Sequence, residues 1–270
     1  QFLLDKDGHP TLVAGVPPDY FSKTGQLWGN PIYNYQRMEK TNFRWWVRRI
    51  KHASKLYDYI RIDHFRGFAS YYAINPADGT ALNGKWIEGP RTKIIDAFNK
   101  VAENRIIAED LGILTQDVFD LMDYAKYPGL NIFQFADFSN WNHKYLPHNY
   151  KEHSVAYLGT HDNDVFKNFL NTNENIKRQI MDYLKIDDET KLVKGALMSL
   201  LASKADVTIF MPQDVLEMDG NVRINIPSEA DGNWTFRFKK SDLKKEKDNV
   251  AKKILTETKS YFPEMIGGGL

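Results

Sequence analysis

The 270-residue sequence contains no cysteine, which excludes disulfide bonds and thiolate metal sites. This absence is compatible with a reducing compartment, and we expect the cytoplasm. The sequence also lacks any apolar run that approaches the length of a membrane span. Neither sign of charge dominates, with 36 basic against 35 acidic residues, so no global field favours nucleic acid or an anionic membrane as partner.

An initiator methionine is also missing, because the sequence begins at Gln1 and enters directly into the stretch FLLDKDGHP. No signal peptide is visible, and we interpret the chain as a piece of a longer protein. Its length fits one large α/β domain, so we expect a single domain over residues 1–270.

Five short apolar runs alternate with helical patterns, which indicates an α/β fold with a parallel sheet. Each run ends in polar or charged residues, as expected of a barrel whose active site lies at the carboxyl ends of its strands. A closed barrel of this kind needs eight strands, so the barrel is expected to be incomplete here, with the early strands missing. The predicted strands are Tyr59–Asp63, Ile106–Glu109, Ile132–Phe135, Val155–Gly159 and Val207–Phe210.

The first of these runs, within YDYIRIDHFRGF, ends in an unusual group of charges. Ile60 and Ile62 alternate with Arg61 and Asp63, so a strand places the apolar pair on one face and the charged pair on the other. The simplest alternative is an ion-paired strand end without catalytic purpose. Two later runs that end in the same manner favour a functional interpretation.

Asp63, Glu109 and Asp162 each lie where a predicted strand meets its loop, and such positions converge on one pocket in a parallel barrel. Three carboxylates around one pocket favour glycoside chemistry. A retaining mechanism needs an ionised nucleophile and a carboxylic acid about 5 Å away. Arg61, on the same strand face as Asp63, is expected to keep Asp63 ionised, whereas Glu109 needs apolar surroundings that raise its pKa.

A divalent-metal site, with these carboxylates and His64 and His161 as ligands, is the competing chemical interpretation. The sequence has no tight ligand spacing such as HExxH, and it has neither a phosphate-binding glycine loop nor a GxSxG turn. We therefore expect no metal and no other cofactor.

Residues 15–35 form a turn-rich, aromatic stretch that is too long for a plain connector. Loops of this length in compact domains are usually functional or disordered, and large aromatic residues argue against disorder. A surface loop packed only on itself is the alternative.

Several of these motifs closely resemble 4-alpha-glucanotransferases, the amylomaltases or disproportionating enzymes of glycoside hydrolase family 77. The three segments that carry charged strand ends resemble the catalytic segments of that family, and the looser pattern is that of the alpha-amylase superfamily. The likeness covers almost the whole of this chain. The segments that form the first half of the family's proteins, with the early barrel strands, are absent from it. The matching segments are RIDHFRGF, IIAEDLG, YLGTHDND, AGVPPDYFSKTGQLWGNPIY, YLPHNY and the late NxPxxxxGNWxxR pattern.

The resemblance implies a (β/α)8 TIM barrel of the alpha-amylase type and a retaining 4-alpha-glucanotransferase. Asp63 is then the nucleophile, Glu109 the general acid/base, and Asp162 the carboxylate that stabilises the transition state. Residues 15–35 are then an inserted loop that covers the active site. The substrate-binding residues that the resemblance implies are Arg61, His64, His161, Tyr20, Phe21, Gln26, Trp28 and Asn225.

Implied partners are a malto-oligosaccharide or glucan donor and a glucose or maltose acceptor, with no nucleic acid and no membrane. Two alternatives stay open at this point. One is a hydrolase of the alpha-amylase kind, and the other is an inactive fragment that at most binds glucan, since an incomplete barrel exposes sheet edges.

Overall fold

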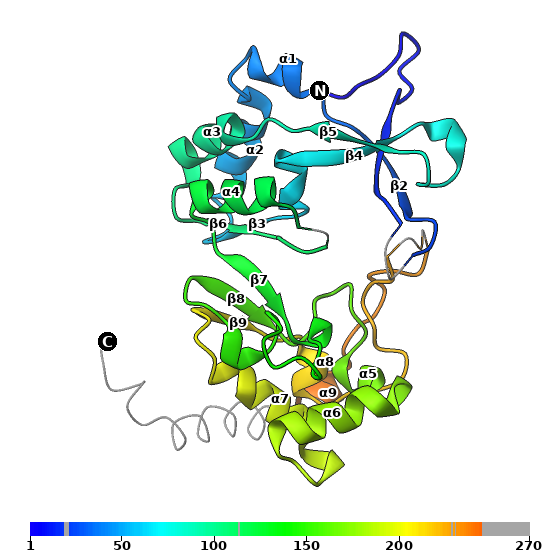
Figure 1. Cartoon of the computed structure of the whole chain (residues 1–270), viewed down its shortest axis with the longest axis vertical. Coiled ribbons are helices and arrows are strands. Elements are labelled where there is room, and N and C mark those ends of the chain that lie inside the picture. Colours follow the sequence, from blue (N-terminus) through cyan, green and yellow to red (C-terminus); the bar gives the residue numbers. More distant parts are fainter. Residues whose placement is uncertain (19–21, 113, 228, 230, 245–270) are drawn as a thin grey trace. The chain divides into compact units, whose positions relative to one another are not determined.

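The computed structural model describes residues 1–18, 22–112, 114–227, 229 and 231–244 (Figure 1). The chain divides into two compact units, Gln1–Leu130 and Asn131–Leu270, and each is described by itself. The expected single domain over residues 1–270 stays a prediction. Within the described ranges, no helix combines the length and the hydropathy that crossing a bilayer requires.

The first unit contains a four-stranded antiparallel sheet in the order β2-β1-β4-β5. Val13 lies opposite Ile74 in this sheet. Gly15 is required in β1, since a Cβ atom there would lie 2.2 Å from the Gln26 carbonyl oxygen. The stretch 15–35 is therefore partly regular structure, which its glycine and proline content did not indicate. The strands are β1 (Val13–Val16), β2 (Gln26–Pro31), β4 (Ser70–Ile74) and β5 (Lys85–Glu88).

The same unit contains a parallel pair, β3 (Ile60–Ile62) and β6 (Ile106–Ala108), in which Ile60 lies opposite Ile106. Helices cover this pair, and their buried side chains form one core with the strands (Figure 1). The pair confirms the predicted parallel pairing of strands at these two runs. The helices of the unit are α1 (Tyr35–Glu39), α2 (Arg44–Ala53), α3 (Thr92–Ala102) and α4 (Gln116–Ala125).

A three-stranded sheet in the order β7-β8-β9 and a second core belong to the other unit. β8 and β9 are parallel, with Val155 opposite Val207. The strands are β7 (Gly129–Ile132), β8 (Ser154–Tyr157) and β9 (Val207–Ile209). The helices are α5 (Phe166–Thr172), α6 (Glu174–Leu184), α7 (Leu192–Leu201), α8 (Pro212–Val215) and α9 (Lys240–Lys244).

The ends of two elements depend on backbone conformations that the sequence pattern does not indicate. The strand expected over Ile132–Phe135 ends at Ile132, and residues 133–135 form a short 3-10 helix instead. Helix α2 begins only at Arg44, because Phe43 adopts a left-handed conformation (φ 52°) and buries its ring in the core. The Thr41 hydroxyl donates to the Met38 carbonyl oxygen (3.0 Å) and so does not cap α2.

Candidate active site

In the first unit, the loops that follow β3 and β6 are joined by backbone hydrogen bonds. The Glu109 N–H donates to the Ile62 carbonyl oxygen (2.9 Å), and the Phe65 N–H donates to the Glu109 carbonyl oxygen (3.0 Å). These bonds extend the parallel ladder past the last residues of both strands. Asp63 and Glu109 are therefore held at the same edge of the sheet, as the sequence predicts for parallel strands.

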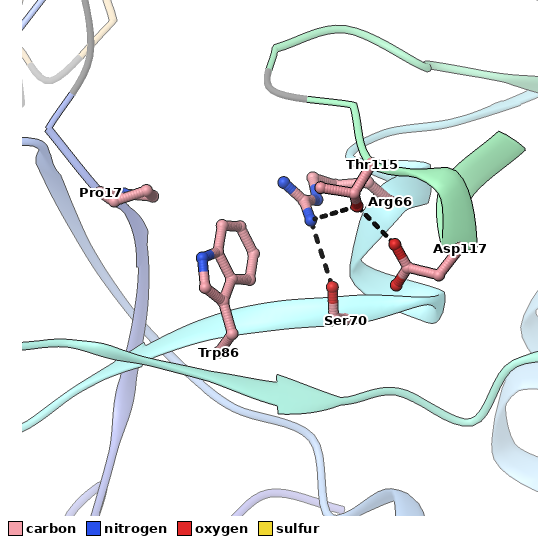
Figure 2. A pocket seen from close by; sticks show the side chains of 6 residues that line it. All are labelled: Pro17, Arg66, Ser70, Trp86, Thr115 and Asp117. Atoms are coloured by element: carbon pink, nitrogen blue, oxygen red, sulfur yellow. Dashed lines mark hydrogen bonds between the residues drawn. The ribbon is translucent and has the colours of Figure 1, made fainter.

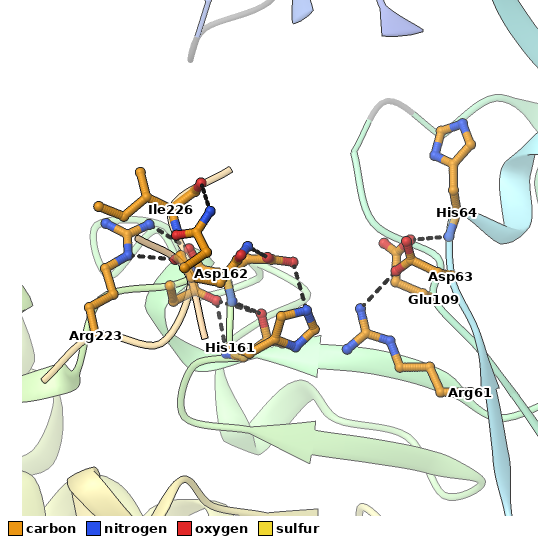
Figure 3. A network of polar contacts seen from close by, with 12 residues as sticks. Arg61, Asp63, His64, Glu109, His161, Asp162, Arg223 and Ile226 are labelled. Atoms are coloured by element: carbon orange, nitrogen blue, oxygen red, sulfur yellow. Dashed lines mark hydrogen bonds and ion pairs between the residues drawn. The ribbon is translucent and has the colours of Figure 1, made fainter. Parts of the chain in front are cut away.

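Asp63 forms an ion pair with Arg61, whose Nη2 lies 3.2 Å from the Asp63 Oδ1 (Figure 3). Arg61 lies on β3 and Asp63 directly follows this strand, with one residue between them. Their side chains therefore leave the chain on the same face. The Arg61 side chain is mostly buried, whereas the Asp63 side chain is 81% exposed. The carboxylate of Asp63 is thus accessible to a ligand while it keeps a positive partner.

Glu109 occupies a different environment, because only 9% of the residue is exposed. Burial, and then the negative charge of Asp63, raises the pKa of the Glu109 carboxyl. Two backbone N–H groups oppose this shift. His64 donates to Oε2 (2.5 Å; Figure 3), and Leu111 donates to Oε1 (3.0 Å). The net direction favours the protonated form, and the hydrogen bonds fix the orientation of the carboxyl group.

His64 links this pair to residues of the stretch 15–35. Its ring lies edge-on to the Trp28 ring, with 4.8 Å between the ring centroids, and the Trp28 indole N–H donates to Gln26 Oε1 (3.0 Å). Burial, and then the charge of Arg66, lowers the pKa of His64 to about 4, so the ring is neutral near pH 7. Trp28 and Gln26 are thus brought to the predicted site, whereas Tyr20 and Phe21 lie outside the described residues.

The second unit holds its own polar network around Asp162 (Figure 3). The Asn225 amide donates to Asp162 Oδ1 (2.7 Å), and His161 Nε2 lies 3.4 Å from Asp162 Oδ2. Arg223 donates to the Asp162 backbone carbonyl oxygen (2.6 Å) and to that of Asn225 (2.9 Å). The structure therefore brings together His161, Asp162 and Asn225, the three predicted site residues of this unit.

Sequence reasoning missed two neighbours of this network, Arg223 and Trp234. The Trp234 ring lies 5.2 Å from the His161 ring between centroids. Trp234 belongs to the NxPxxxxGNWxxR pattern that begins at Asn225, whereas Arg223 lies two residues before that pattern. The signal was present for Arg223, since it precedes Asn225 by two positions in an alternating stretch.

The segment after Asp162 is anchored by a buried carboxyl group on α8. Asp214 is 2% exposed, and its Oδ1 accepts a hydrogen bond from the Phe166 N–H (2.7 Å) at the beginning of α5. Burial raises the pKa of Asp214 to about 6, and the nearby charge of Asp164 acts in the same direction. The side-chain amide of Gln134 donates a hydrogen bond to the Asp164 carbonyl oxygen (2.9 Å). These contacts fix the segment that directly follows Asp162.

A small pocket of about 240 Å³ in the first unit surrounds the buried Arg66 (Figure 2). The guanidinium lies over the Trp86 ring at 3.8 Å from its centroid and donates to Ser70 Oγ (3.2 Å) and Thr115 Oγ1 (3.5 Å). Arg66 follows Asp63 by three residues, and Thr115 lies directly before α4, after the Glu109 loop. The cluster therefore connects the two loops that carry the carboxyl groups of this unit.

Within the first unit, the arrangement combines an exposed carboxylate beside an arginine with a buried carboxyl group of raised pKa. This is the combination that acid–base and nucleophilic chemistry at a glycosidic bond requires. Among the residues that the structure describes, no group of three or more His, Cys, Asp or Glu side chains is arranged to hold a metal ion. The described part of the chain therefore offers no set of ligands that supports the interpretation as a metal site.

Comparisons with known proteins agree with one another. A family model described as 4-alpha-glucanotransferase matches residues 1–243. The chain is 43% identical over 264 residues to a 4-alpha-glucanotransferase of Clostridium butyricum, covering 96% of this chain and 54% of that protein. It is 42% identical over 256 residues to a chloroplastic/amyloplastic 4-alpha-glucanotransferase of Solanum tuberosum, covering 94% of this chain and 44% of that protein.

Among solved structures, the chain is similar to an amylomaltase from Streptococcus agalactiae in complex with acarbose. The TM-score is 0.89 at 36% sequence identity, and the match covers 95% of this chain and 52% of that one. The chain spans about half the length of the curated relatives that it matches.

Proposed function

Because the chain belongs to the 4-alpha-glucanotransferase family, glycoside hydrolase family 77, we propose that it carries the catalytic residues of a retaining 4-alpha-glucanotransferase. The donor would be an α-1,4-linked malto-oligosaccharide or glucan, and the acceptor a second sugar such as glucose or maltose. The observation that carries this proposal is the contrast between Asp63, exposed beside Arg61, and Glu109, buried with a raised pKa.

In the proposed first step, the Asp63 carboxylate attacks the anomeric carbon of the donor, and the bond from that carbon to the leaving O4 breaks. Glu109 gives its proton to the departing oxygen, which leaves as a free 4-hydroxyl. The product is a glycosyl ester on Asp63. The raised pKa of Glu109 supports its role as the proton donor, because the group must arrive protonated.

In the second step, the 4-hydroxyl of the acceptor attacks the anomeric carbon of the ester, and Glu109 accepts the hydroxyl proton. The new α-1,4 bond forms as the bond to Asp63 breaks, so both carboxyl groups return to their starting states. A carboxyl separation of roughly 5 Å between Asp63 and Glu109 is expected for this retaining course.

Other predicted residues have supporting roles in the proposal. Arg61 holds the Asp63 carboxylate in an ion pair, and Asp162 stabilises the transition state while Asn225 and His161 hold its carboxylate. Transfer requires that water is excluded while the acceptor is held, a role we assign to the covering stretch 15–35. The sugar-contacting residues proposed from that stretch are Tyr20, Phe21, Gln26 and Trp28, together with His64 of the neighbouring loop.

The proposed scaffold is a (β/α)8 barrel of the alpha-amylase type. This chain supplies about five of its strands, those that come last in the order of the sequence. The parallel pairs β3–β6 and β8–β9 support this arrangement. We also propose a cytoplasmic location, on the basis of the cysteine-free composition.

Incubation with maltotriose tests the proposed reaction. A transferase produces glucose together with maltopentaose and longer oligomers, at a constant total number of reducing ends. A hydrolase of the alpha-amylase kind raises the number of reducing ends without longer products, and this outcome would sink the transferase proposal. The assay is run on the 270-residue chain and on a chain extended upstream, so that an inactive fragment is distinguished from a different activity.

A further inference from the structure

Trp141 is the most exposed of the large hydrophobic side chains described in the second unit, with 65% of its surface accessible. It lies in the loop FSNWNHKYLPHNY between β7 and β8, which contains none of the residues that take part in the proposed reaction. A single exposed aromatic residue is common on protein surfaces. This one differs because its position is fixed by several specific contacts.

The indole of Trp141 stacks on the His148 ring, with 4.1 Å between ring centroids and 25° between ring planes. The Tyr183 ring of α6 lies 5.8 Å from the indole and packs in turn on Phe138 at 5.6 Å. Phe138 contacts the fully buried Phe133. A continuous series of rings therefore anchors the exposed indole to the core of the second unit.

Hydrogen bonds fix the backbone of the same loop. The Trp141 carbonyl oxygen lies 2.8 Å from His148 Nε2 and accepts a hydrogen bond from the Asn149 amide (2.8 Å). Because a carbonyl oxygen only accepts, Nε2 of His148 carries the proton, and in the neutral ring Nδ1 accepts from the Tyr183 hydroxyl (2.9 Å).

From these contacts we infer that Trp141, His148 and Tyr183, the aromatic platform, form a second glucan-binding site outside the catalytic network, in which the Trp141 ring stacks against a glucose unit. The choice of an α-1,4-glucan over another sugar rests on the proposed function. An aromatic ring that is already immobilised loses little conformational entropy when a ligand binds, which favours stacking at such a position.

The size and surroundings of the platform favour a sugar over a protein partner. A tryptophan side chain supplies on the order of 200 Å² of contact area, whereas a stable protein interface needs about 800 Å² from each partner. The exposed neighbours Asn140, Asn142 and His148 are polar, so the indole is not part of a wide apolar patch. One apolar ring with a polar rim matches one face of a glucose unit.

The test is affinity electrophoresis of the purified chain in native gels that contain amylopectin, with dextran gels for comparison. All proteins carry Asp63→Asn, so that turnover does not alter the polymer. Trp141→Ala should weaken amylopectin binding by about five- to tenfold, and Tyr183→Phe, which keeps the ring, should weaken it less. The matched control is Phe119→Ala, which removes an exposed aromatic ring of α4 in the first unit and should leave binding unchanged.

Equal retardation of the parent and the Trp141→Ala protein would overturn the inference, as would equal losses in Trp141→Ala and Phe119→Ala. A dimer in size-exclusion chromatography that Trp141→Ala dissociates would also overturn it, because the ring would then belong to an interface between copies. Dextran retardation that depends on Trp141 as strongly as amylopectin retardation would overturn the preference for α-1,4-glucan.

Turnover separates this inference from the proposed function. With Asp63 intact, Trp141→Ala should disproportionate maltotriose at the rate of the parent chain, because so short a substrate does not need a second site. If the parent chain does not act on maltotriose but its amylopectin retardation still depends on Trp141, the proposed reaction fails and the platform stands.

Discussion

At the scale of single residues, the first unit places two carboxyl groups in contrasting surroundings within one short segment of parallel sheet. Asp63 is exposed beside a guanidinium, and Glu109 is buried beneath two backbone N–H donors. The contrast arises from the loops, because the backbone N–H groups of His64 and Leu111 hold the Glu109 carboxyl group, whereas Asp63 has, among the described residues, only the side chain of Arg61 as its partner. This division suits a nucleophile and a proton donor in one pair.

Asp63→Asn and Glu109→Gln each remove one of these functions with little change of volume. Each variant should reduce kcat on maltotriose by several orders of magnitude, because the covalent step or the proton transfer is lost. Steady-state kinetics at equal far-UV circular dichroism check this prediction, with exposed Glu103→Gln as the control. Near-normal turnover in either site variant would overturn its assigned role.

At the scale of elements, Arg66 connects the turn after β3 with the strand β5 and the beginning of α4. Its guanidinium contacts Ser70, Trp86 and Thr115, and the negative charge of Asp117 lies close enough to act on its pKa (Figure 2). A planar guanidinium stacks on an indole and donates in several directions at once, which a lysine ammonium does not reproduce. The side chain therefore acts as a link between the two loops that carry Asp63 and Glu109.

Arg66→Lys should lower the free energy of unfolding by about 1–3 kcal/mol, since stacking and at least one hydrogen bond are lost while the charge remains. Urea unfolding measures this change. The matched control is Arg91→Lys, whose ion pair with Glu88 (3.4 Å) is exposed and should cost less than about 0.5 kcal/mol. Similar losses at both positions would show that the link around Arg66 adds no stability of its own.

Asp214 gives the second unit a pH-dependent contact between α8 and the beginning of α5. Its pKa of about 6 in the folded chain exceeds the ordinary value of 3.8, so the folded state binds more protons than the unfolded state between these values. The contribution of Asp214 to stability is therefore full below about pH 4 and is lost as the pH rises through about 6.

Asp214→Asn keeps an oxygen acceptor for the Phe166 N–H but does not titrate. The free energy of unfolding of the parent relative to this variant should fall by roughly 2 kcal/mol between pH 4 and pH 7. Urea unfolding of both proteins across this pH range measures the difference between their free energies of unfolding. The titration of groups that both proteins share cancels in this difference. A difference that does not change with pH would contradict the buried, titrating state of Asp214.

The elements also show what the sequence predicts and what it does not. Apolar runs that end in charge located Asp63, Glu109 and Asp162, because a buried strand and its polar end leave a local pattern. The antiparallel sheet was missed, since β1 and β4 pair Val13 with Ile74 across a long separation, and no local signal encodes such a partner. The beginning of α2 has no local signal either, because it follows Phe43, whose left-handed conformation accompanies the burial of its ring in the core.

At the scale of the whole molecule, the parallel sheets of the described residues contain fewer strands than the eight-stranded barrel that the proposed reaction implies. β3 and β6 form a two-stranded parallel sheet, and parallel sheets of this class are stable when both edges and both faces are covered. The chain also spans about half of the relatives that it matches. The two facts together predict that additional strands from the family's first half stabilise the site.

A fusion in which the N-terminal half of the Clostridium butyricum relative precedes Gln1 tests this prediction. The fusion should unfold at a higher temperature than the 270-residue chain and should disproportionate maltotriose faster, because neighbouring strands cover the edge of β3 and hold Asp63 and Glu109 in place. Differential scanning calorimetry and product analysis measure the two gains. The same fusion with Asp63→Asn should keep the gain in stability and lose the gain in activity. If the fusion gains neither, the 270-residue chain does not depend on upstream strands, and the incomplete-barrel interpretation is wrong.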